Sequence, residues 1–470
     1  MKYKTEPMAH QREGAERFHE CEYGALFWEM GSGKTKAILD VVGNGPCDGI
    51  MVLAPNGLHL NWDAIEVEKH LPCDDYIVYC WRGTPTTQKA KRELLEFYEA
   101  KAEKKVWLMN VEAIRNKTGL GYAMDFMKDH SHVELIIDES TCIKNHKAAQ
   151  SKAAMKLGTM ATRRWILNGT PITQGPLDLW SQCRFLAKNC LPYSTWTGFK
   201  SMFAIEEVMM MQNRAFKKII GYQNLERLKE EIKPFSSRIL KEECMDLPDK
   251  TFMQRAVELT AEQRKIYSEV KDLCLSELEN GSIVSVTIAL AKIVKLHQIL
   301  CGFVVDDGGT AIDIPNNRLT AVAQIAETTK PLVIFCAYRR NIDQVAAMLR
   351  KEYGDDSVVE YHGGTNTEGR QEAVRRFQNG EADFFIGTSA AAKGLTLHRA
   401  HTMIYYANTY SLETRLQSQD RIHRHGQKNA CTYIDLVVPD SLDQMIIDRL
   451  TSKKDLADMV LTDLQKAIQS

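Results

Sequence analysis

Two short segments of the chain carry side chains whose types and order suit phosphate chemistry. Residues 29–35 read Glu-Met-Gly-Ser-Gly-Lys-Thr and follow an apolar run of strand character at residues 23–28. Residues 135–139 read Leu-Ile-Ile-Asp-Glu, an apolar strand that ends in two acids. A glycine-rich turn that begins a helix cradles phosphate oxygens, and a carboxylate at a strand end holds a divalent cation. Together the two segments predict a nucleoside triphosphate, ATP, bound with Mg²⁺.

Each residue of the glycine turn has an expected role. Gly31 and Gly33 permit the tight turn that brings backbone N–H groups, including that of Ser32, against phosphate oxygens. We expect Lys34 to reach the β- and γ-phosphates and the Thr35 hydroxyl to ligate Mg²⁺. The helix that begins here directs its positive end toward the anion. The turn is therefore the predicted ATP-binding site.

The acidic pair completes this prediction, because the glycine turn alone is an incomplete match. The pattern G-x-x-x-x-G-K-[ST] asks for a glycine at the position of Trp28. A simple glycine-rich turn and a solvated acidic strand end are the alternative interpretations of the two segments taken singly. In combination they favour ATP hydrolysis, with Asp138 holding Mg²⁺ through water and Glu139 orienting and deprotonating the attacking water.

Length and composition indicate a protein of more than one domain. The 470 residues suffice for two or three domains, and contents of 44% hydrophobic and 26% charged residues are ordinary. A net charge of −1 shows no overall basic excess, although a local basic groove is compatible with it. The twelve cysteines lack a Cys-x-x-Cys spacing, which predicts reduced thiols in a cytosolic protein. No apolar run suits a signal peptide or a membrane span, so we expect no membrane partner.

The apolar runs predict an α/β protein with two parallel-sheet lobes in tandem and a helical insertion between them. The expected parts are a first lobe at 1–185, the insertion and connector at 186–300, a second lobe at 301–440 and a C-terminal brace helix at 441–470. The strands expected in the first lobe are Gly49–Leu53, Val106–Met109, Leu135–Ile137 and Arg164–Leu167. Those expected in the second lobe are Leu332–Phe335, Ser357–Tyr361, Phe384–Ile386, Met403–Tyr406 and Tyr433–Val437.

A late segment carries two arginines that suit a phosphate group. Residues 417–427 read Gln-Ser-Gln-Asp-Arg-Ile-His-Arg-His-Gly-Gln, and we expect a helix that places Arg421 and Arg424 on one face. A guanidinium delivered from a second lobe can stabilise a transferring phosphoryl group as an arginine finger. An ion-paired surface helix is the alternative interpretation, which the flanking glutamines and the His-Arg-His-Gly-Gln ending make less favourable.

The chain resembles the Swi/Snf-type ATPases of helicase superfamily two, in the compact versions found in bacteria and their phages. The late motif of that family, Gln-x-x-Asp-Arg-x-His-Arg-x-Gly-Gln, is matched position by position by residues 417–427. Other segments that resemble family motifs are Gln11, Ala54-Pro55 with Trp62, Asp138-Glu139 with Lys144-Asn145, Gly169 to Ile172, Lys295 to Ile299, His362-Gly363 and Gly387-Thr388. The chain departs from the family at Thr141, where histidine is frequent, and at Ala391-Ala392, which replace a glycine pair.

The resemblance implies two RecA-like lobes that hydrolyse ATP in the cleft between them while the protein tracks along duplex DNA. It implies that Gln11 reads the adenine and that Gln417 belongs to the ATP site. Tracking along phosphates requires backbone N–H groups, hydroxyls and a few basic side chains. The side chains expected to contact DNA are Thr170, Thr388, Ser389 and Lys393.

Four further residues each have two interpretations. Arg238 and Lys241 would contact the second DNA strand or form a solvated basic face. Trp62 and Trp81 would stack on bases or, more commonly for such residues, lie in the core.

Three functions compete on this evidence. The favoured one is an ATP-dependent DNA translocase and remodeller, the second is a strand-separating or branch-migrating helicase, and the third is a nucleotide-gated DNA-binding adaptor without turnover. The intact Lys34, Asp138, Glu139 and arginine pair weigh against the adaptor. The expected partners are double-stranded or branched DNA and replication, recombination or repair proteins. We expect a protein that is monomeric when free and acts in the cytoplasm of a bacterial or phage-infected cell.

Overall fold

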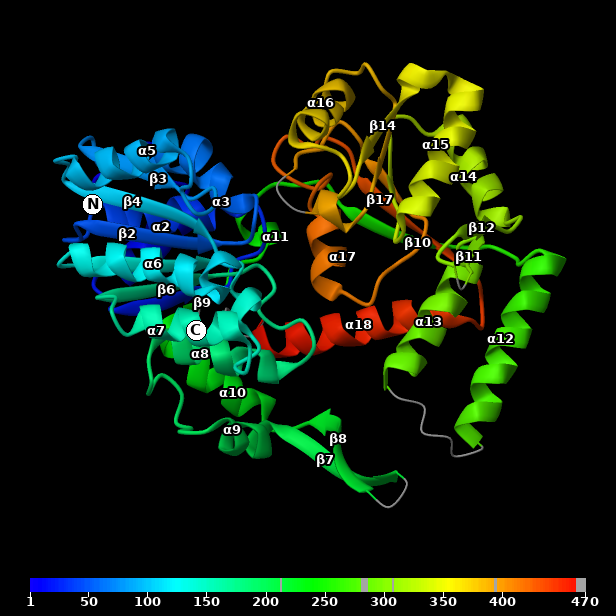
Figure 1. Ribbon diagram of the computed structural model, residues 1–470, viewed down its shortest axis with the longest axis horizontal. Helices are drawn as coiled ribbons and strands as arrows, with labels where there is room; N and C mark the ends of the chain where they lie inside the picture. Colours follow the sequence, from blue (N-terminus) through cyan, green and yellow to red (C-terminus); the bar gives the residue numbers. More distant parts are fainter. Residues whose placement is uncertain (212–213, 280–285, 307, 393–394, 462–470) are drawn as a thin grey trace. The chain divides into compact units, whose positions relative to one another are not determined.

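The computed structural model describes residues 1–211, 214–279, 286–306, 308–392 and 395–461. Within these ranges the chain forms two compact units, the first built chiefly from residues up to Met245 and the second from residues 246–452 (Figure 1). Each unit contains a sheet of parallel strands, so the predicted α/β class with two parallel-sheet lobes is confirmed. None of the described helices combines the length and the apolar character needed to cross a membrane.

The first unit is built on a seven-stranded sheet with the order β3-β4-β2-β5-β6-β1-β9, in which neighbouring strands run parallel. The strands are β1 (Tyr23–Leu26), β2 (Gly49–Ala54), β3 (Tyr76–Cys80), β4 (Lys104–Asn110), β5 (Val133–Asp138), β6 (Arg163–Leu167) and β9 (Ser236–Ser237). The α-helices of this unit are α1 (Ala9–His19), α2 (Lys34–Gly43), α3 (Leu58–Asn61), α4 (Glu68–His70), α5 (Gln88–Glu99), α6 (Lys117–Asp129), α7 (Ala149–Gly158), α8 (Leu179–Leu186), α9 (Trp196–Phe203), α10 (Leu225–Ile232) and α11 (Lys241–Cys244).

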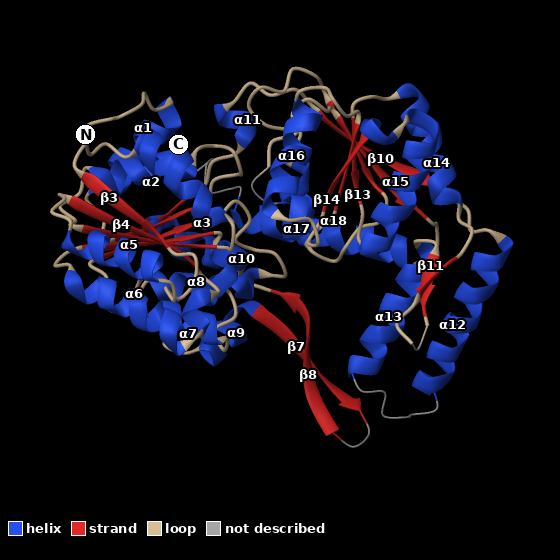
Figure 2. Cartoon of the chain, turned by 45° about the horizontal axis from the view of Figure 1, so that its top comes forward, coloured by secondary structure: helices blue, strands red, loops and turns tan. Residues whose placement is uncertain are grey.

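Strand β2 shows why this sheet lies in the interior of the unit. All six of its residues are buried, as expected for a parallel strand covered on both faces. Successive side chains point to opposite faces, so Ile50 and Val52 pack with α1 and α2, whereas Met51 and Leu53 pack with helices α5 to α8. Figure 2 shows these two helix layers on either side of the sheet.

The second unit contains a six-stranded parallel sheet with the order β10-β17-β16-β13-β15-β14. Its strands are β10 (Lys250–Ala256), β13 (Leu332–Phe335), β14 (Val358–Tyr361), β15 (Phe384–Gly387), β16 (Thr402–Tyr405) and β17 (Cys431–Val437), and a separate pair is formed by β11 (Phe303–Val305) and β12 (Ala311–Asp313). The α-helices are α12 (Ala261–Glu279), α13 (Val286–Leu300), α14 (Asn317–Thr328), α15 (Arg339–Tyr353), α16 (Thr367–Gln378), α17 (Leu412–Gln419) and the start of α18 (Leu442–Leu461).

The range expected to hold a helical insertion and connector also contains strands. A hairpin of β7 (Ala204–Met211) and β8 (Arg214–Tyr222) lies inside it, and β10 joins the sheet of the second unit beside β17. The strands expected from apolar runs in the two lobes are present within a few residues of their expected ends. Strand β3, at one edge of the first sheet, and the two-residue β9, at the other edge, were not expected.

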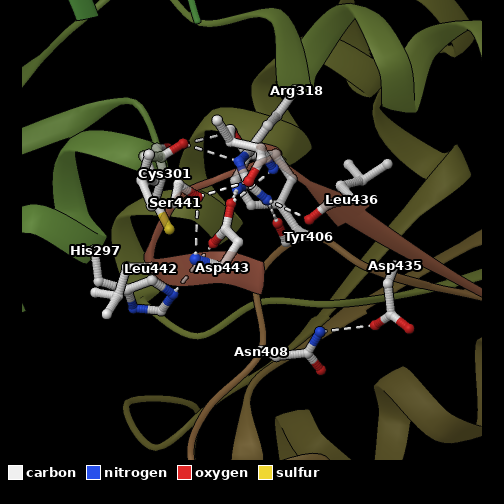
Figure 3. A network of polar contacts seen from close by, with 12 residues as sticks. His297, Cys301, Arg318, Tyr406, Asn408, Asp435, Leu436, Ser441, Leu442 and Asp443 are labelled. Carbon is white, nitrogen blue, oxygen red and sulfur yellow. Dashed lines mark hydrogen bonds and ion pairs between the residues drawn. The ribbon is translucent and has the colours of Figure 1, made fainter. Parts of the chain in front are cut away.

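A buried arginine ties several elements of the second unit together (Figure 3). Arg318 on α14 is 1% exposed and forms an ion pair with Asp443 at the start of α18. Its guanidinium also donates to the carbonyl oxygens of Leu300, Tyr406 and Leu436. Because a buried guanidinium without acceptors is strongly unfavourable, this set of partners fixes α13, α14, α18 and the ends of β16 and β17 relative to one another. The predicted brace helix thus begins as an element docked on this unit.

The same network predicts a pH dependence of stability through His297. Burial, with the nearby charge of Arg318, lowers the pKa of His297 from 6.5 to about 4, although Asp443 opposes this shift. Between these values the unfolded chain binds a proton that the folded chain does not, so stability falls as the pH falls. We expect a loss of up to about 3 kcal/mol between pH 7 and pH 4 from this group. Urea unfolding of the wild type and of His297→Gln across this pH range measures it, and equal pH slopes in the two proteins would contradict the assignment.

Candidate functional site

The glycine turn predicted to bind ATP connects β1 to α2. Gly31 and Gly33 have φ angles of +83° and +84°, a left-handed conformation that favours glycine. Lys34 begins α2, and its buried ammonium donates to the carbonyl oxygens of Trp28 at 2.9 Å and Glu29 at 3.3 Å. The turn therefore has the shape expected of a phosphate cradle, with a lysine held at its centre.

The glutamine predicted to read adenine lies against this turn. Gln11 on α1 is buried, accepts a hydrogen bond from the Met8 N–H at 3.0 Å and donates to the carbonyl of Ser32 at 3.4 Å. A Cβ added to Gly33 would lie 2.0 Å from its Nε2 atom. Gln11 and the glycine turn, which are separated along the chain, thus lie together at the start of α2. Thr35 lies in the first turn of that helix.

Trp28, the departure from the expected pattern, has a structural role. Its indole is fully buried, donates to the Ser237 hydroxyl at 2.9 Å and packs so closely on Gly14 of α1 that a Cβ there would lie 2.4 Å from the ring. The tryptophan therefore fixes α1, and with it Gln11, against the glycine turn.

Two basic residues, Arg238 and Lys241, support the glycine turn. The sequence had left two interpretations for them, a contact with DNA or a solvated basic face. Arg238 is buried and donates to the carbonyl oxygens of Phe27 at 2.6 Å and Gly169 at 3.0 Å. The backbone N–H of Lys241, which is also buried, donates to the Glu29 carboxylate at 2.8 Å. The solvated-face interpretation is wrong, because both side chains are buried. Contact of these residues with DNA stays a prediction.

The predicted catalytic acids lie at the end of β5. The Asp138 carboxylate accepts hydrogen bonds from the Trp62 indole at 3.0 Å and from the Glu139 backbone N–H at 2.9 Å. Glu139 is buried and has a φ angle of +50°, a strained conformation for a residue other than glycine. Trp62 is 2% exposed, so the prediction of burial rather than base stacking is confirmed for it, with an added role in orienting Asp138. Trp81 is likewise buried.

Strand register brings the two segments to one edge of the sheet. In the parallel ladders, Leu26 of β1 and Asp138 of β5 both pair with Leu167 of β6. The glycine turn and the acids therefore leave the sheet from the same row, two strand spacings or about 10 Å apart. Such an edge is where open parallel sheets bind their ligands.

A buried hydrogen-bonded path links the acids to the loop after β6, and sequence analysis missed it. The Ser140 hydroxyl donates to the Gln182 side chain at 2.6 Å, and the Gln182 amide donates to the Pro171 carbonyl at 2.8 Å. Asn168 contacts the Ser140 hydroxyl at 3.3 Å and accepts from the Thr170 N–H at 2.7 Å. This path supplies a link between acids and loop that does not depend on a histidine at the position of Thr141.

The arginine pair of the second unit lies beyond α17, not on a helix. The predicted helical face is wrong because backbone bonds from Arg421 to Ser418 and from Ile422 to Gln419 turn the chain tightly after Gln419. The two guanidinium groups nevertheless converge, since Arg421 and Arg424 both donate to the Leu395 carbonyl, at 3.0 Å and 2.8 Å. The spacing in the sequence therefore predicted correctly that Arg421 and Arg424 lie side by side, but it predicted the wrong backbone conformation.

Glutamines and a histidine around this pair support its turns. Gln427 donates to the carbonyl oxygens of His398, Ala400 and Ile422. Gln417, predicted to belong to the ATP site, is 1% exposed, and its backbone carbonyl accepts from Arg421 at 2.8 Å. Burial and the neighbouring charges of Arg424 and His425 lower the pKa of His398. His398 and its neighbours thus shape the turn around the arginines.

The residues predicted to contact DNA differ in their exposure to solvent. Thr170 is buried in the loop after β6, and Thr388 follows β15 in a half-buried position. Ser389 is exposed. Lys393 lies outside the described residues. Among the described residues, no group of three or more histidine, cysteine, aspartate or glutamate side chains is arranged to hold a metal ion.

A cavity of about 590 Å³ opens in the first unit at the carboxyl ends of β2, β3 and β4. Its polar lining comprises Asn56, Arg82, Thr84, Asn110, Asn116 and Thr118, with His59 and Trp81 beside them. None of these described lining side chains is a carboxylate. Amide, hydroxyl and guanidinium donors of this kind suit a phosphodiester backbone.

Comparison with known proteins assigns this arrangement to a family. Residues 10–302 match the SNF2-related domain, and residues 317–426 match the helicase conserved C-terminal domain. The chain belongs to the SNF2-related family, the Swi/Snf-type ATPases of helicase superfamily two.

Individual relatives are distant and longer than this chain. The nuclear protein STH1/NPS1 of Saccharomyces cerevisiae is 26% identical over 93% of this chain and 33% of its own length. The probable ATP-dependent DNA helicase CHR12 of Arabidopsis thaliana is 26% identical over 92% of this chain and 39% of its own. The chain thus spans between a third and two fifths of these relatives. A solved structure, the Sulfolobus solfataricus SWI2/SNF2 ATPase core in complex with dsDNA, is similar at a TM-score of 0.42 and 22% identity, over 98% of this chain and 94% of that chain.

The two glycines of the turn provide a matched test of the ATP site. Alanine at either position adopts an unfavourable left-handed conformation, but only Gly33→Ala also forces the Gln11 amide away. We expect Gly31→Ala to weaken binding of a fluorescent ATP analogue about tenfold and Gly33→Ala to weaken it by about tenfold more. In a Gln11→Ala background the extra cost should vanish. Equal losses for both glycines in the parent protein would contradict this geometry.

The indole that contacts Asp138 provides a second test. Trp62→Phe keeps the buried ring but removes the N–H donor, and we expect ATP turnover or apparent Mg²⁺ affinity to fall by about 10- to 100-fold. The matched control is Trp107→Phe, because the buried Trp107 indole N–H has no hydrogen-bond partner within the described structure. Steady-state hydrolysis measured against Mg²⁺ concentration compares the two variants. A similar effect of both would mean that packing, not the Asp138 contact, is responsible.

Proposed function

We propose that the protein is an ATP-dependent DNA translocase and remodeller of the Swi/Snf type. The observation that carries the proposal is the common sheet edge of the glycine turn and the Asp138-Glu139 pair, fixed by the pairing of β1, β6 and β5. This arrangement suits a nucleotide whose phosphates lie on the turn and whose Mg²⁺ lies toward the acids.

In the proposed site, the chain holds ATP through the turn at residues 31–35 and through Gln11. Thr35 and Asp138 would hold Mg²⁺, which supplies charge neutralisation of the phosphates. Glu139 would orient the attacking water and accept its proton. Its strained backbone, buried position and link through Ser140 to the loop after β6 support a role that depends on fixed geometry.

Duplex DNA is the nucleic acid along which we propose that the protein moves. Support comes from the carboxylate-free cavity at the same edge of the first sheet as the glycine turn, and from Ser389 and Thr388 after β15 of the second sheet. One relative is named a probable ATP-dependent DNA helicase, which is in keeping with DNA rather than RNA. Contacts of hydroxyl, amide and guanidinium groups to phosphates give binding without sequence preference, as tracking requires.

The two units would work as alternating grips. In the proposed cycle, bound ATP draws Arg421 and Arg424 of the second unit toward its phosphates, and hydrolysis by Glu139 releases them. We call the state with the arginines against the phosphates the closed state. ATP favours this state because it binds it more tightly than the state with the arginines withdrawn. Since each unit holds the backbone separately, one cycle moves the grip along a strand.

ATP turnover with different nucleic acids tests this proposal. We expect duplex DNA to raise the hydrolysis rate well above that with single-stranded DNA, with no release of a labelled strand from a partial duplex. Strand release coupled to hydrolysis would favour the helicase alternative. Absence of stimulation by any DNA would overturn the proposal. DNA binding gated by ATP without turnover would overturn it in favour of an adaptor.

The late arginines supply a sharper prediction. Arg424→Ala should lower DNA-stimulated turnover by about 10³- to 10⁵-fold while leaving ATP affinity nearly unchanged, because an arginine finger acts on transferring charge. Arg424→Lys should restore little, since it lacks the planar fork. The paired readouts are steady-state hydrolysis and equilibrium binding of a fluorescent ATP analogue. If ATP affinity fell as far as turnover, the residue would be a binding group instead.

A further inference from the structure

The β7–β8 hairpin exposes an unusual amount of apolar surface for a part of a folded unit. Val208 and Met210 are 61% and 70% exposed, and Phe216 and Ile220 are 44% and 56% exposed. Within β7, Val208 and Met210 point to one face while Met209, also exposed, points to the other. Apolar side chains are therefore exposed on both faces of a two-stranded ribbon, which is not the pattern of a surface that packs on one side.

The base of the hairpin is firmly held in the first unit. Phe203, immediately before β7, is fully buried, and its carbonyl accepts from the Gln223 N–H at 3.0 Å after β8. Ile219 and Tyr222 pack against the core of the unit. The ribbon thus extends from a fixed base and forms a two-stranded sheet of its own, apart from the sheet of the first unit (Figures 1 and 2).

The base also touches the loop that is linked to the catalytic acids. Tyr222 lies so close to Gly175 that a Cβ there would be 2.1 Å from the tyrosine hydroxyl. The same loop holds Asp178, whose carboxylate accepts from the Thr173 and Gln174 N–H groups at 2.9 Å. Gln182 joins this loop, at Pro171, to Ser140, which follows Glu139 in the chain. A displacement of the ribbon would therefore reach Glu139 through this loop.

The charges of strand β8 favour an anionic partner, although β7 carries Glu206 and the exposed Glu207. Strand β8 reads Arg-Ala-Phe-Lys-Lys-Ile-Ile-Gly-Tyr, with three basic residues and no acid. In β7, Glu206 already forms ion pairs with Lys200 and with Lys217, the latter at 3.9 Å. Lys217 is still 67% exposed, and its neighbour Lys218 is exposed as well and points to the opposite face.

We propose that the β7–β8 hairpin contacts duplex DNA by lying in a groove, with Lys217 and Lys218 on phosphates and the exposed apolar side chains against the groove walls. The major groove admits a two-stranded ribbon, and a groove surrounds an inserted element on both faces. Apolar side chains contact thymine methyl groups or wedge at base steps. The proposal deepens the proposed function, on which it rests, by naming the element that engages the duplex and signals to the acids.

Two sets of substitutions separate the charge contribution from the apolar one. Binding of a blunt, labelled duplex to the full chain is measured by anisotropy over a range of salt concentrations. Lys217→Gln with Lys218→Gln should lower the slope of log affinity against log salt by about two, one for each lost phosphate contact. Val208→Thr, Met210→Thr and Phe216→Thr together should weaken binding about tenfold at every salt concentration with the slope unchanged. All three positions are exposed, and threonine suits a strand.

The controls are matched side chains on α5 of the same unit. Lys89→Gln with Lys91→Gln, and Leu95→Gln, alter exposed residues of the same kinds and should leave both quantities unchanged. Hydrolysis without DNA should be unaffected in every hairpin variant, whereas stimulation by duplex DNA should fall with binding. Hairpin variants that bind and respond like the controls would overturn the hairpin proposal alone. A wild-type chain that binds no duplex would overturn the proposed function with it.

A photocrosslinker at the position of Phe216 identifies the partner directly. With duplex DNA present we expect the crosslink on DNA. A crosslink to a second copy of the chain, with none to DNA, would show that the ribbon is a protein-docking element and would overturn the proposal.

Discussion

The pairing of β6 with both β1 and β5 is the constraint on which the rest of the first unit depends. Because Leu26 and Asp138 share Leu167 as their partner, the chain leaves β1 and β5 at the same row of the sheet. Hydrogen bonding of parallel strands fixes this row, and a slip by one residue would turn every buried side chain of a strand to the other face. Backbone geometry thus sets the position of the glycine turn relative to the two acids, whatever side chains stand at the site.

The features around this edge limit motion in a similar way. Trp28 fixes α1 against the glycine turn, Arg238 ties the turn to the loop after β6, and Trp62 orients Asp138. Each contact involves a buried donor that would be costly to leave without an acceptor. A site of this kind is preorganised, so that changes in one loop are transmitted to the next. The link from Ser140 through Gln182 to Pro171 is the clearest example.

Much of this architecture could be predicted from sequence because apolar runs and glycine turns act locally. Strands such as β2 and β5 are continuous apolar segments, and Gly31 and Gly33 mark a turn whatever surrounds them. Strand β7 could not be predicted in this way, since its Ala-Ile-Glu-Glu-Val-Met-Met-Met sequence contains good helix formers that pair as a ribbon instead. The burial of Arg238 and Lys241 was not foreseen, because charge usually indicates exposure. For Arg238, the backbone carbonyls of Phe27 and Gly169 accept from the guanidinium and allow burial. Arg421 and Arg424 were assigned to a helix because an i, i+3 spacing cannot distinguish a helix from consecutive turns.

The central claim is that ATP bound on the turn at residues 31–35 is hydrolysed by water that Glu139 activates. Single-turnover hydrolysis by Glu139→Gln, with radiolabelled ATP and excess enzyme in the presence of duplex DNA, tests it most directly. The account predicts that ATP is bound stoichiometrically and is recovered almost entirely uncleaved over times in which the wild type completes a turnover. Cleavage by the variant at the wild-type rate, with ATP bound equally well, would contradict the account.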